Sequence, residues 1–320
     1  MDAFSKSCWV VYDKGKVGSA HQCLGLAEAL GFTPKTFDIS PRLPWKFLSP
    51  GMWLSPLRGA MDQSKNFLSP PWPDVIIASG RSTVAPTQAI RRLTKGATKV
   101  VQLQNPTIPP ENFDLVIAPA HDCIQGPNVL VTQGALHLVN RTKLQHAAEH
   151  FKHQVQHLKA PFLTILLGGN SRRYRLDPEV SRKMAAQLRD VAQKQSVSLL
   201  VIPSRRTGAE NIAVFQQELQ NCPAVVWNEA GENPYMGFLA LADYIMVTSD
   251  SVSMTSEACY TGKPVYTYHL PGGAAISDRF HSLFVYKGYT RPFKGRLEAW
   301  EYPPLDEFSK VVEAVKQRLY

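Results

Sequence analysis

The sequence predicts an α/β protein made of two Rossmann-like, doubly wound domains. Short apolar runs alternate with longer runs of helical character along the whole chain, a pattern typical of parallel sheets covered by helices on both faces. Gly, Ser, Asn and Arg directly follow many of the apolar runs. The length of 320 residues corresponds to about two domains.

The first half of the chain alternates between strand-like and helix-like runs. Each strand candidate is a short apolar run bounded by turn or polar residues, and each helix candidate carries apolar residues three and four apart. We expect strands at 8–12, 35–39, 75–78, 99–103, 115–118 and 129–131, and helices at 20–30 and 84–93.

The second half repeats this alternation. Strands are expected at 162–167, 198–202, 224–227, 244–247 and 265–268, and helices near 178–193, 209–220, 235–242 and 253–260. A His-rich helix near 143–158 links the halves, so we place an N-terminal domain at 1–142 and a C-terminal domain at 143–304. The amphipathic segment 305–320 is expected to pack back on the N-terminal domain.

Composition indicates a soluble globular chain with 44% hydrophobic and 19% charged residues. No stretch approaches the roughly 20 consecutive apolar residues of a membrane span. The N-terminus runs almost at once into the strand at 8–12, so we expect no signal peptide and a cytoplasmic protein. The five cysteines are scattered and odd in number, which favours reduced, partly buried thiols over disulfides or a metal site.

The net charge of +9 favours acidic partners such as nucleic acid, anionic lipid or phosphorylated small molecules. The arginines lie mainly just after strands, and no Lys/Arg tract with interleaved aromatics is present. This distribution predicts discrete phosphate sites and argues against a nucleic-acid groove.

Polar loops follow the strands of the second half, and open parallel sheets bind their ligands at the carboxyl ends of strands. All five loops should therefore lie on one edge of the same sheet. Glycines let the backbone approach a ligand, and arginines bind phosphate oxygens in pairs. Together they predict a site for the diphosphate of a nucleotide-type ligand. The residues of its first two loops are Gly168, Gly169, Asn170, Arg172, Arg173, Ser204, Arg205 and Arg206.

The stretch 249–259 carries the strongest local signal. Its strand ends in Ser249, Asp250, Ser251 and Ser253, which open a helix whose N-terminal N–H groups and dipole suit an anion. Glu257, one turn further on, should face the same spot. A purely structural interpretation is a capped helix, with Ser253 as its N-cap and Glu257 interacting with the helix dipole.

The loop 13–22 of the first half offers a second candidate site. It lacks the Walker and G-x-G-x-x-G spacings, but it places Asp13 and His21 near a helix N-terminus that should face a cleft between the domains. Either residue is a candidate general base. The alternative is that His21 is a helix-capping or solvent-exposed histidine.

The histidines at 146, 150, 153 and 157 raise the question of a metal site. At 100° per residue they share one helical face, whereas Leu144, Phe151, Val155 and Leu158 lie on the opposite side. We therefore predict that the histidines form the solvent-exposed face and hold no metal.

The segment 41–73 separates two strands and is rich in aromatic residues and methionines. Its cations are scattered, and its single acidic residue is Asp62. This mixture resembles a surface that contacts anionic lipid or accepts a lipid-linked substrate. An irregular helical insertion packed on its own domain is the alternative. The residues concerned are Trp45, Phe47, Met52, Trp53, Met61, Phe67 and Trp72, with Arg42, Lys46, Arg58 and Lys65.

Several of these segments together resemble the elongated-mitochondria family, which is named for a plant mitochondrial fission factor and has bacterial members. The matching segments are 13–31, 102–122, 168–176, 204–207, 233–266 and 279–303, and the most specific is Asn233-Pro234-Tyr235 followed by 247–264. The resemblance implies a GT-B-like architecture, in which two Rossmann-like domains face each other across a cleft.

In GT-B enzymes the second domain holds a nucleotide-sugar, so the resemblance assigns Gly168, Gly169 and Asn170 to the diphosphate and Glu257 to the ribose or sugar. The loop 13–22 is similar to that of the transferase that adds N-acetylglucosamine to lipid-linked peptidoglycan precursors. A histidine lies near the helix start in that enzyme, and His21 corresponds to it here.

These observations predict a metal-independent glycosyltransferase that takes a nucleotide-sugar as donor, needs no cofactor and uses an envelope glycan or lipid-linked acceptor. It would work in the cytoplasm, in peripheral contact with the inner membrane. Arginines would neutralise the leaving diphosphate, and Asp13 or His21 would deprotonate the acceptor. The alternatives are a non-catalytic adaptor with the same fold and an epimerase that does not use NAD.

Overall fold

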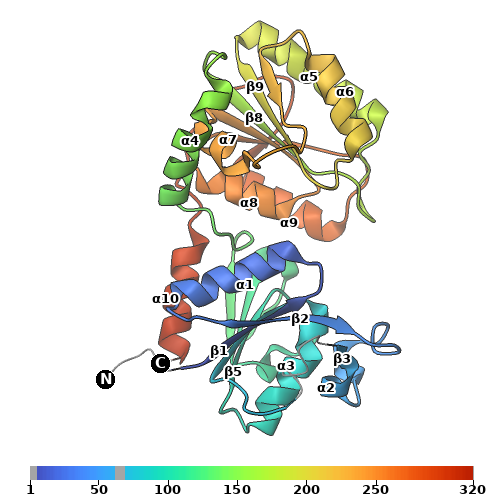
Figure 1. Cartoon of the computed structure of the whole chain (residues 1–320), viewed down its shortest axis with the longest axis vertical. Helices are drawn as coiled ribbons and strands as arrows, with labels where there is room; N and C mark the ends of the chain where they lie inside the picture. The colour runs from blue at the N-terminus through green and yellow to red at the C-terminus, as the bar shows by residue number, and fades with distance from the viewer. Residues whose placement is uncertain (1–5, 62–68, 320) are drawn as a thin grey trace. The chain divides into compact units, whose positions relative to one another are not determined.

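The computed structural model describes residues 6–61 and 69–319. The positions Asp62, Lys65 and Phe67 of the aromatic segment lie outside these described residues. The chain forms two compact units, Met1–Leu138 with Asp306–Tyr320, and Val139–Leu305. Each unit contains one sheet, shown with its helices in Figure 1.

The sheet of the first unit has the order β3-β2-β1-β4-β5-β6-β7. The six strands expected in this half all form and pair in parallel. The two-residue edge strand β3, which runs antiparallel to β2, was not predicted because it is too short to show a pattern. The bounds are β1 Cys8–Asp13, β2 Lys35–Pro41, β3 Ala60–Met61, β4 Val75–Ser79, β5 Lys99–Leu103, β6 Leu115–Pro119 and β7 Val129–Thr132.

Helices cover both faces of this sheet. On one face, α1 (Val17–Ala29) and α10 (Glu307–Leu319) bury Leu26 and Val315 against the strands. On the other, α3 (Arg81–Leu93) buries Val84 and Ile90. The short helix α2 (Pro56–Gly59) and the 3-10 turn η1 (Pro50–Met52) contact α3.

The sheet of the second unit is parallel throughout and has the order β10-β9-β8-β11-β12-β13. The predicted ends of β8 and β12 agree with the structure to the residue. The strand β13 was not predicted, because it has three residues, ends in proline and lies at the sheet edge. The bounds are β8 Phe162–Leu167, β9 Ser198–Pro203, β10 Ala224–Val226, β11 Tyr244–Thr248, β12 Val265–Tyr268 and β13 Thr290–Pro292.

Helices again cover both faces (Figure 1). Helices α5 (Pro178–Gln195) and α6 (Ala209–Leu219) pack on one face, and four helices share the other core cluster. These are α4 (Arg141–Val155), α7 (Tyr235–Leu241), α8 (Val252–Tyr260) and α9 (Ala275–Tyr286). We had not predicted α9, whose buried Phe280 and Phe284 lie four residues apart.

The histidine-bearing helix α4 has the predicted orientation, because His146, His150, His153 and His157 are exposed whereas Phe151 and Val155 are buried. Nowhere in the described ranges do three or more His, Cys, Asp or Glu side chains gather as a group that could hold a metal ion. The cysteines are free thiols, and Cys123 is exposed. Within the same ranges no helix is long and apolar enough to cross a membrane.

Candidate functional site

The candidate site lies at the carboxyl edge of the second sheet. Strands β10, β9, β8, β11 and β12 are parallel neighbours in that order, so the loops that follow them leave the sheet on the same side. This confirms that the five polar loops share one edge. Hydrogen bonds between the loops then determine which side chains remain available to a ligand.

Asp250 joins three of these loops. Its carboxylate accepts hydrogen bonds from the Gly169 N–H (3.0 Å) and the Thr248 hydroxyl (2.7 Å), and it pairs with the Arg206 guanidinium at 2.8 Å. The Asp250 side chain is 0% exposed. A Cβ on Gly168 would overlap this carboxylate, so glycine is required there. Asp250 is therefore surrounded by protein groups, and it holds the loops together.

The loop after β9 is tied to the loop after β8. The buried Thr207 hydroxyl donates to the Gly168 carbonyl at 2.6 Å and accepts from the Ser204 N–H at 2.9 Å. The Asn170 N–H donates to the Arg206 carbonyl at 3.0 Å. Sequence reasoning did not single out Thr207 or Thr248 as site residues. Their only signal was a position beside the predicted loop residues.

The backbone amides of residues 168–170 are all engaged within the protein. The Gly168 N–H donates to the Thr248 hydroxyl (2.7 Å), and the Gly169 and Asn170 N–H groups donate to Asp250 and to the Arg206 carbonyl. The Asn170 side chain makes two hydrogen bonds to the backbone of Leu176, each 2.9 Å. These three residues shape the loop, and their hydrogen-bonding groups point into the protein network.

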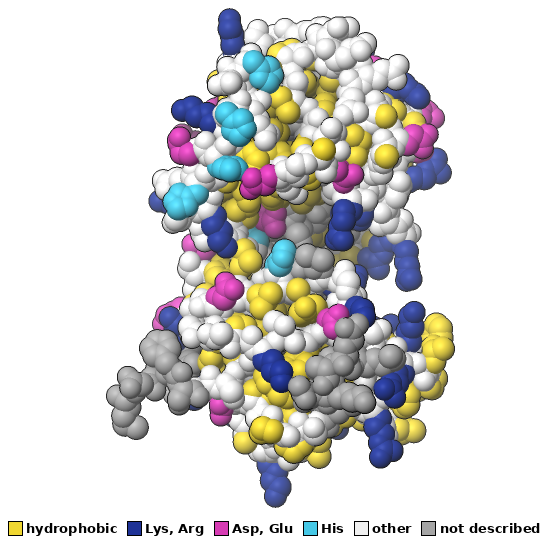
Figure 2. Space-filling model, in the orientation of Figure 1, with side chains coloured by type: hydrophobic (Ala, Val, Ile, Leu, Met, Phe, Trp, Pro, Cys, Tyr) yellow, Lys and Arg dark blue, Asp and Glu magenta, His cyan; other side chains and the backbone are white. Residues whose placement is uncertain are grey.

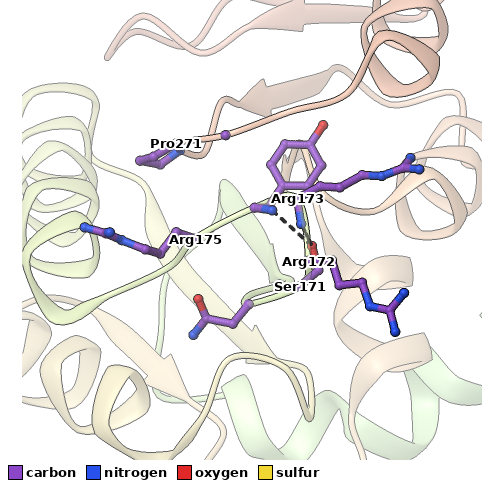
Figure 3. A pocket seen from close by; sticks show the side chains of 8 residues that line it. Ser171, Arg172, Arg173, Arg175 and Pro271 are labelled. Carbon is purple, nitrogen blue, oxygen red and sulfur yellow. Dashed lines mark hydrogen bonds between the residues drawn. The ribbon is translucent and has the colours of Figure 1, made fainter.

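The residues 170–175 form one wall of an open hollow of about 500 Å³. The loop docks on the one after β12 because the Gly273 N–H donates to the Arg173 carbonyl (2.8 Å) and the Arg175 N–H to the Pro271 carbonyl (3.0 Å). Figure 3 shows Arg172 and Arg173 extending to one side of the loop and Arg175 to the other. Arg175 pairs with Asp177 at 3.1 Å.

All four predicted arginines are exposed, but they differ in whether they form an ion pair. In the described parts of the chain, Arg172, Arg173 and Arg205 form no ion pair, whereas the neighbouring Arg206 is held by Asp250. Because all three come from loops that follow adjacent strands, this edge carries positive charge without a protein counter-ion. An exposed group of guanidinium forks suits an anion with several oxygens.

The N-terminus of α8 differs in detail from the structural interpretation made above. Ser251, and not Ser253, is the N-cap, because its extended backbone places Oγ where it accepts from the Met254 N–H at 3.3 Å. Ser253 is exposed in the first turn. Ser249 is buried and accepts from the Leu270 N–H at 3.0 Å, and its carbonyl hydrogen-bonds to His281 Nε2 at 2.8 Å.

Glu257 lies half-buried on α8 and accepts a hydrogen bond from the Tyr235 hydroxyl. Burial raises the pKa of Glu257 to about 7, and the Tyr235 hydrogen bond opposes part of that rise. Tyr235 opens α7, where its N–H donates to Asn233 Oδ1 at 2.9 Å. We did not predict Tyr235 as a site residue, although the motif Asn233-Pro234-Tyr235 was a signal for it.

Asp13 and His21 belong to the first unit and have different surroundings. Asp13 ends β1 and accepts from the Ser82 N–H at 2.9 Å, so it caps α3 across the sheet edge where Gly80 supplies no side chain. Burial raises the pKa of the Asp13 carboxyl. His21 is exposed on α1.

Two comparisons concern the sequence. The profile of the family described as Mitochondrial fission ELM1 matches residues 17–319. The "Mitochondrial fission protein ELM1" of Arabidopsis thaliana is 30% identical over 290 residues, covering 82% of this chain and 68% of that protein. The "Uncharacterized protein RP120" of Rickettsia prowazekii is 26% identical over 352 residues, covering 96% and 97%.

Solved structures share the fold at low sequence identity. The UDP-GlcNAc 2-epimerase of Methanocaldococcus jannaschii has a TM-score of 0.58 at 12% identity, with 98% of this chain and 99% of that one covered. The Acinetobacter baumannii MurG has a TM-score of 0.55 at 11% identity, with 97% and 99% covered. A Neisseria meningitidis UDP-GlcNAc 2-epimerase bound to UDP-GlcNAc has a TM-score of 0.56 at 13% identity, with 97% and 90% covered. The fold is therefore GT-B-like.

Proposed function

Because this chain belongs to the mitochondrial fission ELM1 family and has a GT-B-like fold, we propose that it is a glycosyltransferase. It takes a sugar from a nucleotide-sugar and transfers it to an envelope glycan or a lipid-linked acceptor. The observation that carries the proposal is the group of exposed arginines Arg172, Arg173 and Arg205 at the carboxyl edge of the second sheet.

The arginines bind the diphosphate of the donor. When the sugar–phosphate bond breaks, negative charge grows on the leaving diphosphate, and fixed guanidinium groups stabilise it without a metal ion. Asp250 contributes indirectly, because it pairs with Arg206 and holds the loops that carry the other three. The first N–H groups of α8 have no carbonyl within the helix and add donors beside Ser253.

Two observations support a nucleotide-sugar as the donor: the chemistry of this edge and the ligands of proteins with this fold. A diphosphate linked to a sugar presents several anionic oxygens to the arginines and hydroxyl groups to a carboxyl such as Glu257. The Neisseria meningitidis protein with this fold was solved with UDP-GlcNAc bound. Glu257 accepts a hydrogen bond from a ribose or sugar hydroxyl, and the Tyr235 hydroxyl orients its carboxyl.

On the acceptor side, we propose His21 as the general base. It is exposed, whereas the Asp13 carboxylate already accepts a hydrogen bond from the N-terminus of α3. Because the proposed acceptor belongs to the envelope, we also propose that the protein works in the cytoplasm at the inner-membrane surface.

A non-catalytic adaptor is the second candidate. It is favoured by the 30% identity to the plant protein, which is named for mitochondrial fission and not for an enzymatic activity. An adaptor would keep the fold and tolerate substitution of the exposed arginines.

A thermal-shift screen tests the proposal. The chain is heated with UDP-, GDP-, ADP- and CMP-linked sugars and with the free nucleotides, because a ligand that binds only the folded state raises the melting temperature. At 100 times its Kd, a ligand adds about 2.7 kcal/mol to the free energy of unfolding. We expect one nucleotide class to shift the melting temperature.

Arg205→Ala should abolish this shift. Its matched control is Arg175→Ala, which removes a guanidinium that pairs with Asp177 and extends to the other side of the loop. No shift with any ligand would favour the adaptor. Free UDP and an epimerised sugar formed without acceptor would identify an epimerase instead.

A further inference from the structure

Exposed apolar side chains gather on one part of the first unit. Eight large apolar residues are exposed in the described chain, and five of these lie between residues 43 and 54 or at the end of α3. Leu54 is 97% exposed and Phe47 78%. The other three are Leu43, Met52 and Leu93. Single exposed apolar residues are normal, but a contiguous group marks an interaction surface.

The backbone that carries these side chains is firmly held. The buried Trp53 side chain packs beside Gly59, where a Cβ would press on the rings of Trp45 and Trp53. Arg81 donates to the Leu48 carbonyl at 3.0 Å, which ties the segment to α3. A hollow of about 430 Å³ between α2 and α3 is lined by Leu54 and Leu93. Part of this segment therefore packs on its own unit. The remaining side chains are exposed to solvent on a backbone that these contacts hold in place.

The same surface is positively charged. Residues 39–61 and 75–99 contain no Asp or Glu. Five exposed cations, which form no ion pair within the described chain, lie among the apolar side chains: Arg42, Lys46, Arg58, Arg81 and Arg92. Figure 2 shows hydrophobic and Lys/Arg side chains side by side over this part of the unit, around α2 and β3 of Figure 1.

We propose that residues 42–58 and the C-terminal end of α3 form a docking surface for an anionic lipid bilayer. Phe47 and Leu54 enter the apolar layer, and the cations lie at the level of the lipid phosphates. An anionic bilayer offers an apolar layer for the exposed apolar side chains and phosphates for the cations. A second copy of the chain does not, because face-to-face contact would bring two groups of like charge together. Docking of this surface on a bilayer does not require transferase activity.

Vesicle co-sedimentation of the full chain tests this surface, without any nucleotide. The vesicles contain phosphatidylcholine alone, or phosphatidylcholine and phosphatidylglycerol in equal parts. We expect binding to the anionic vesicles that weakens as salt is added. The double variant Phe47→Ser/Leu54→Ser should bind at least tenfold more weakly. Lys46→Glu/Arg58→Glu should lose about fivefold or more for each charge changed.

Matched controls come from the second unit. Tyr286→Ser removes an apolar side chain that is 85% exposed, and Lys152→Glu/Lys159→Glu reverses two exposed cations. Both controls should bind anionic vesicles like the unchanged chain. The melting temperature of every variant is measured first, and it should be unchanged because the altered side chains are exposed.

Three results would overturn the inference. One is an absence of binding to anionic vesicles even at low salt. Another is equal loss of binding in the surface variants and the controls. The third is a dimer in sedimentation analysis that only Phe47→Ser/Leu54→Ser converts to a monomer, which would assign the surface to self-association. These three measurements contain no nucleotide, so a negative result in the nucleotide screen would not affect them.

Discussion

Each unit places a carboxylate against a glycine at the carboxyl ends of its two central strands. The strand that carries the carboxylate in one unit corresponds to the strand that carries the glycine in the other. In the first unit, Asp13 ends β1 and lies against Gly80, which follows the neighbouring β4. In the second, Gly168 follows β8 and lies against Asp250, which follows the neighbouring β11. In both sheets these two strands are neighbours, and the order in which the chain adds strands reverses between them.

The surroundings of the two carboxylates differ. Asp13 is half-buried and accepts from a helix N–H, whereas Asp250 is fully buried and has two hydrogen-bond donors and the Arg206 guanidinium around it. A buried charge is tolerated only when it is paired and hydrogen-bonded. The second unit uses Arg206 for this pairing, and the neighbouring Arg205 forms no ion pair within the described residues.

The largest expected effect separates the two carboxylates. Asp250→Ala leaves the Gly169 N–H and the Thr248 hydroxyl without their acceptor and removes the counter-ion of Arg206. The free energy of unfolding should fall by about 3–5 kcal/mol, and urea denaturation measures it. A loss below about 1 kcal/mol would contradict the central role of Asp250.

Glu257 is a half-buried carboxyl whose hydrogen-bond partner is a tyrosine and not a cation. Burial raises the pKa of Glu257 from 4.5 to about 7 in the folded chain. The folded chain therefore binds a proton that the unfolded chain has released, and stability falls as the pH rises from about 4.5 to about 7. This loss amounts to about 3 kcal/mol at most.

Glu257→Gln should remove this pH dependence. The unfolding free energies of the unchanged chain and the variant are compared at both ends of the same pH range, where their difference isolates Glu257. Carboxyls whose pKa is lowered, such as Asp114 beside Arg91, act at lower pH and cancel in the comparison. Parallel pH profiles would show that Glu257 titrates normally.

Asp13→Ala should have a smaller effect than the equivalent change in the second unit. It removes an acceptor for the Ser82 N–H at the start of α3, which resembles the loss of an N-cap and costs about 1 kcal/mol. The measurement is the same urea denaturation. If Asp13→Ala and Asp250→Ala cost the same, pairing with arginine is not what distinguishes the two units.

The smallest effect is expected for His21→Ala. The side chain is exposed on α1, so the free energy of unfolding should change by no more than about 0.5 kcal/mol. Donor binding should also be unchanged in the thermal-shift screen, because the residues proposed to bind the donor belong to the second unit. A large loss of stability would show that His21 is a structural residue.

Local pattern was sufficient for most of the fold. The strands β8 and β12 were predicted to the residue because buried parallel strands are short apolar runs bounded by turn residues. The shared edge of the five loops followed from the parallel connectivity alone. The segments β3, β13 and α9 were not predicted: the two strands are too short to show a period, and their pairing depends on neighbours distant in the sequence.

The roles of individual side chains were harder to predict. Adjacent residues of one type, such as Arg205 and Arg206, look equivalent in the sequence, yet only Arg206 reaches Asp250, some 40 residues away. The contact between Tyr235 on α7 and Glu257 on α8 was equally hidden in the sequence, because it joins two different helices. We predicted that Gly168, Gly169 and Asn170 contact a ligand. The sequence did not indicate that their backbone N–H groups donate hydrogen bonds within the protein.

From the sequence alone we could predict the two α/β units, the edge of the second sheet where polar loops gather, and the basic, aromatic character of residues 42–58. These follow from periodicity and composition, which are local properties of the chain. The folded structure was needed to learn which carboxylate is buried and paired, which of the exposed arginines pairs with it, and which apolar side chains reach solvent. Each of these depends on contacts between segments far apart in the sequence, where burial determines whether a charge needs a partner.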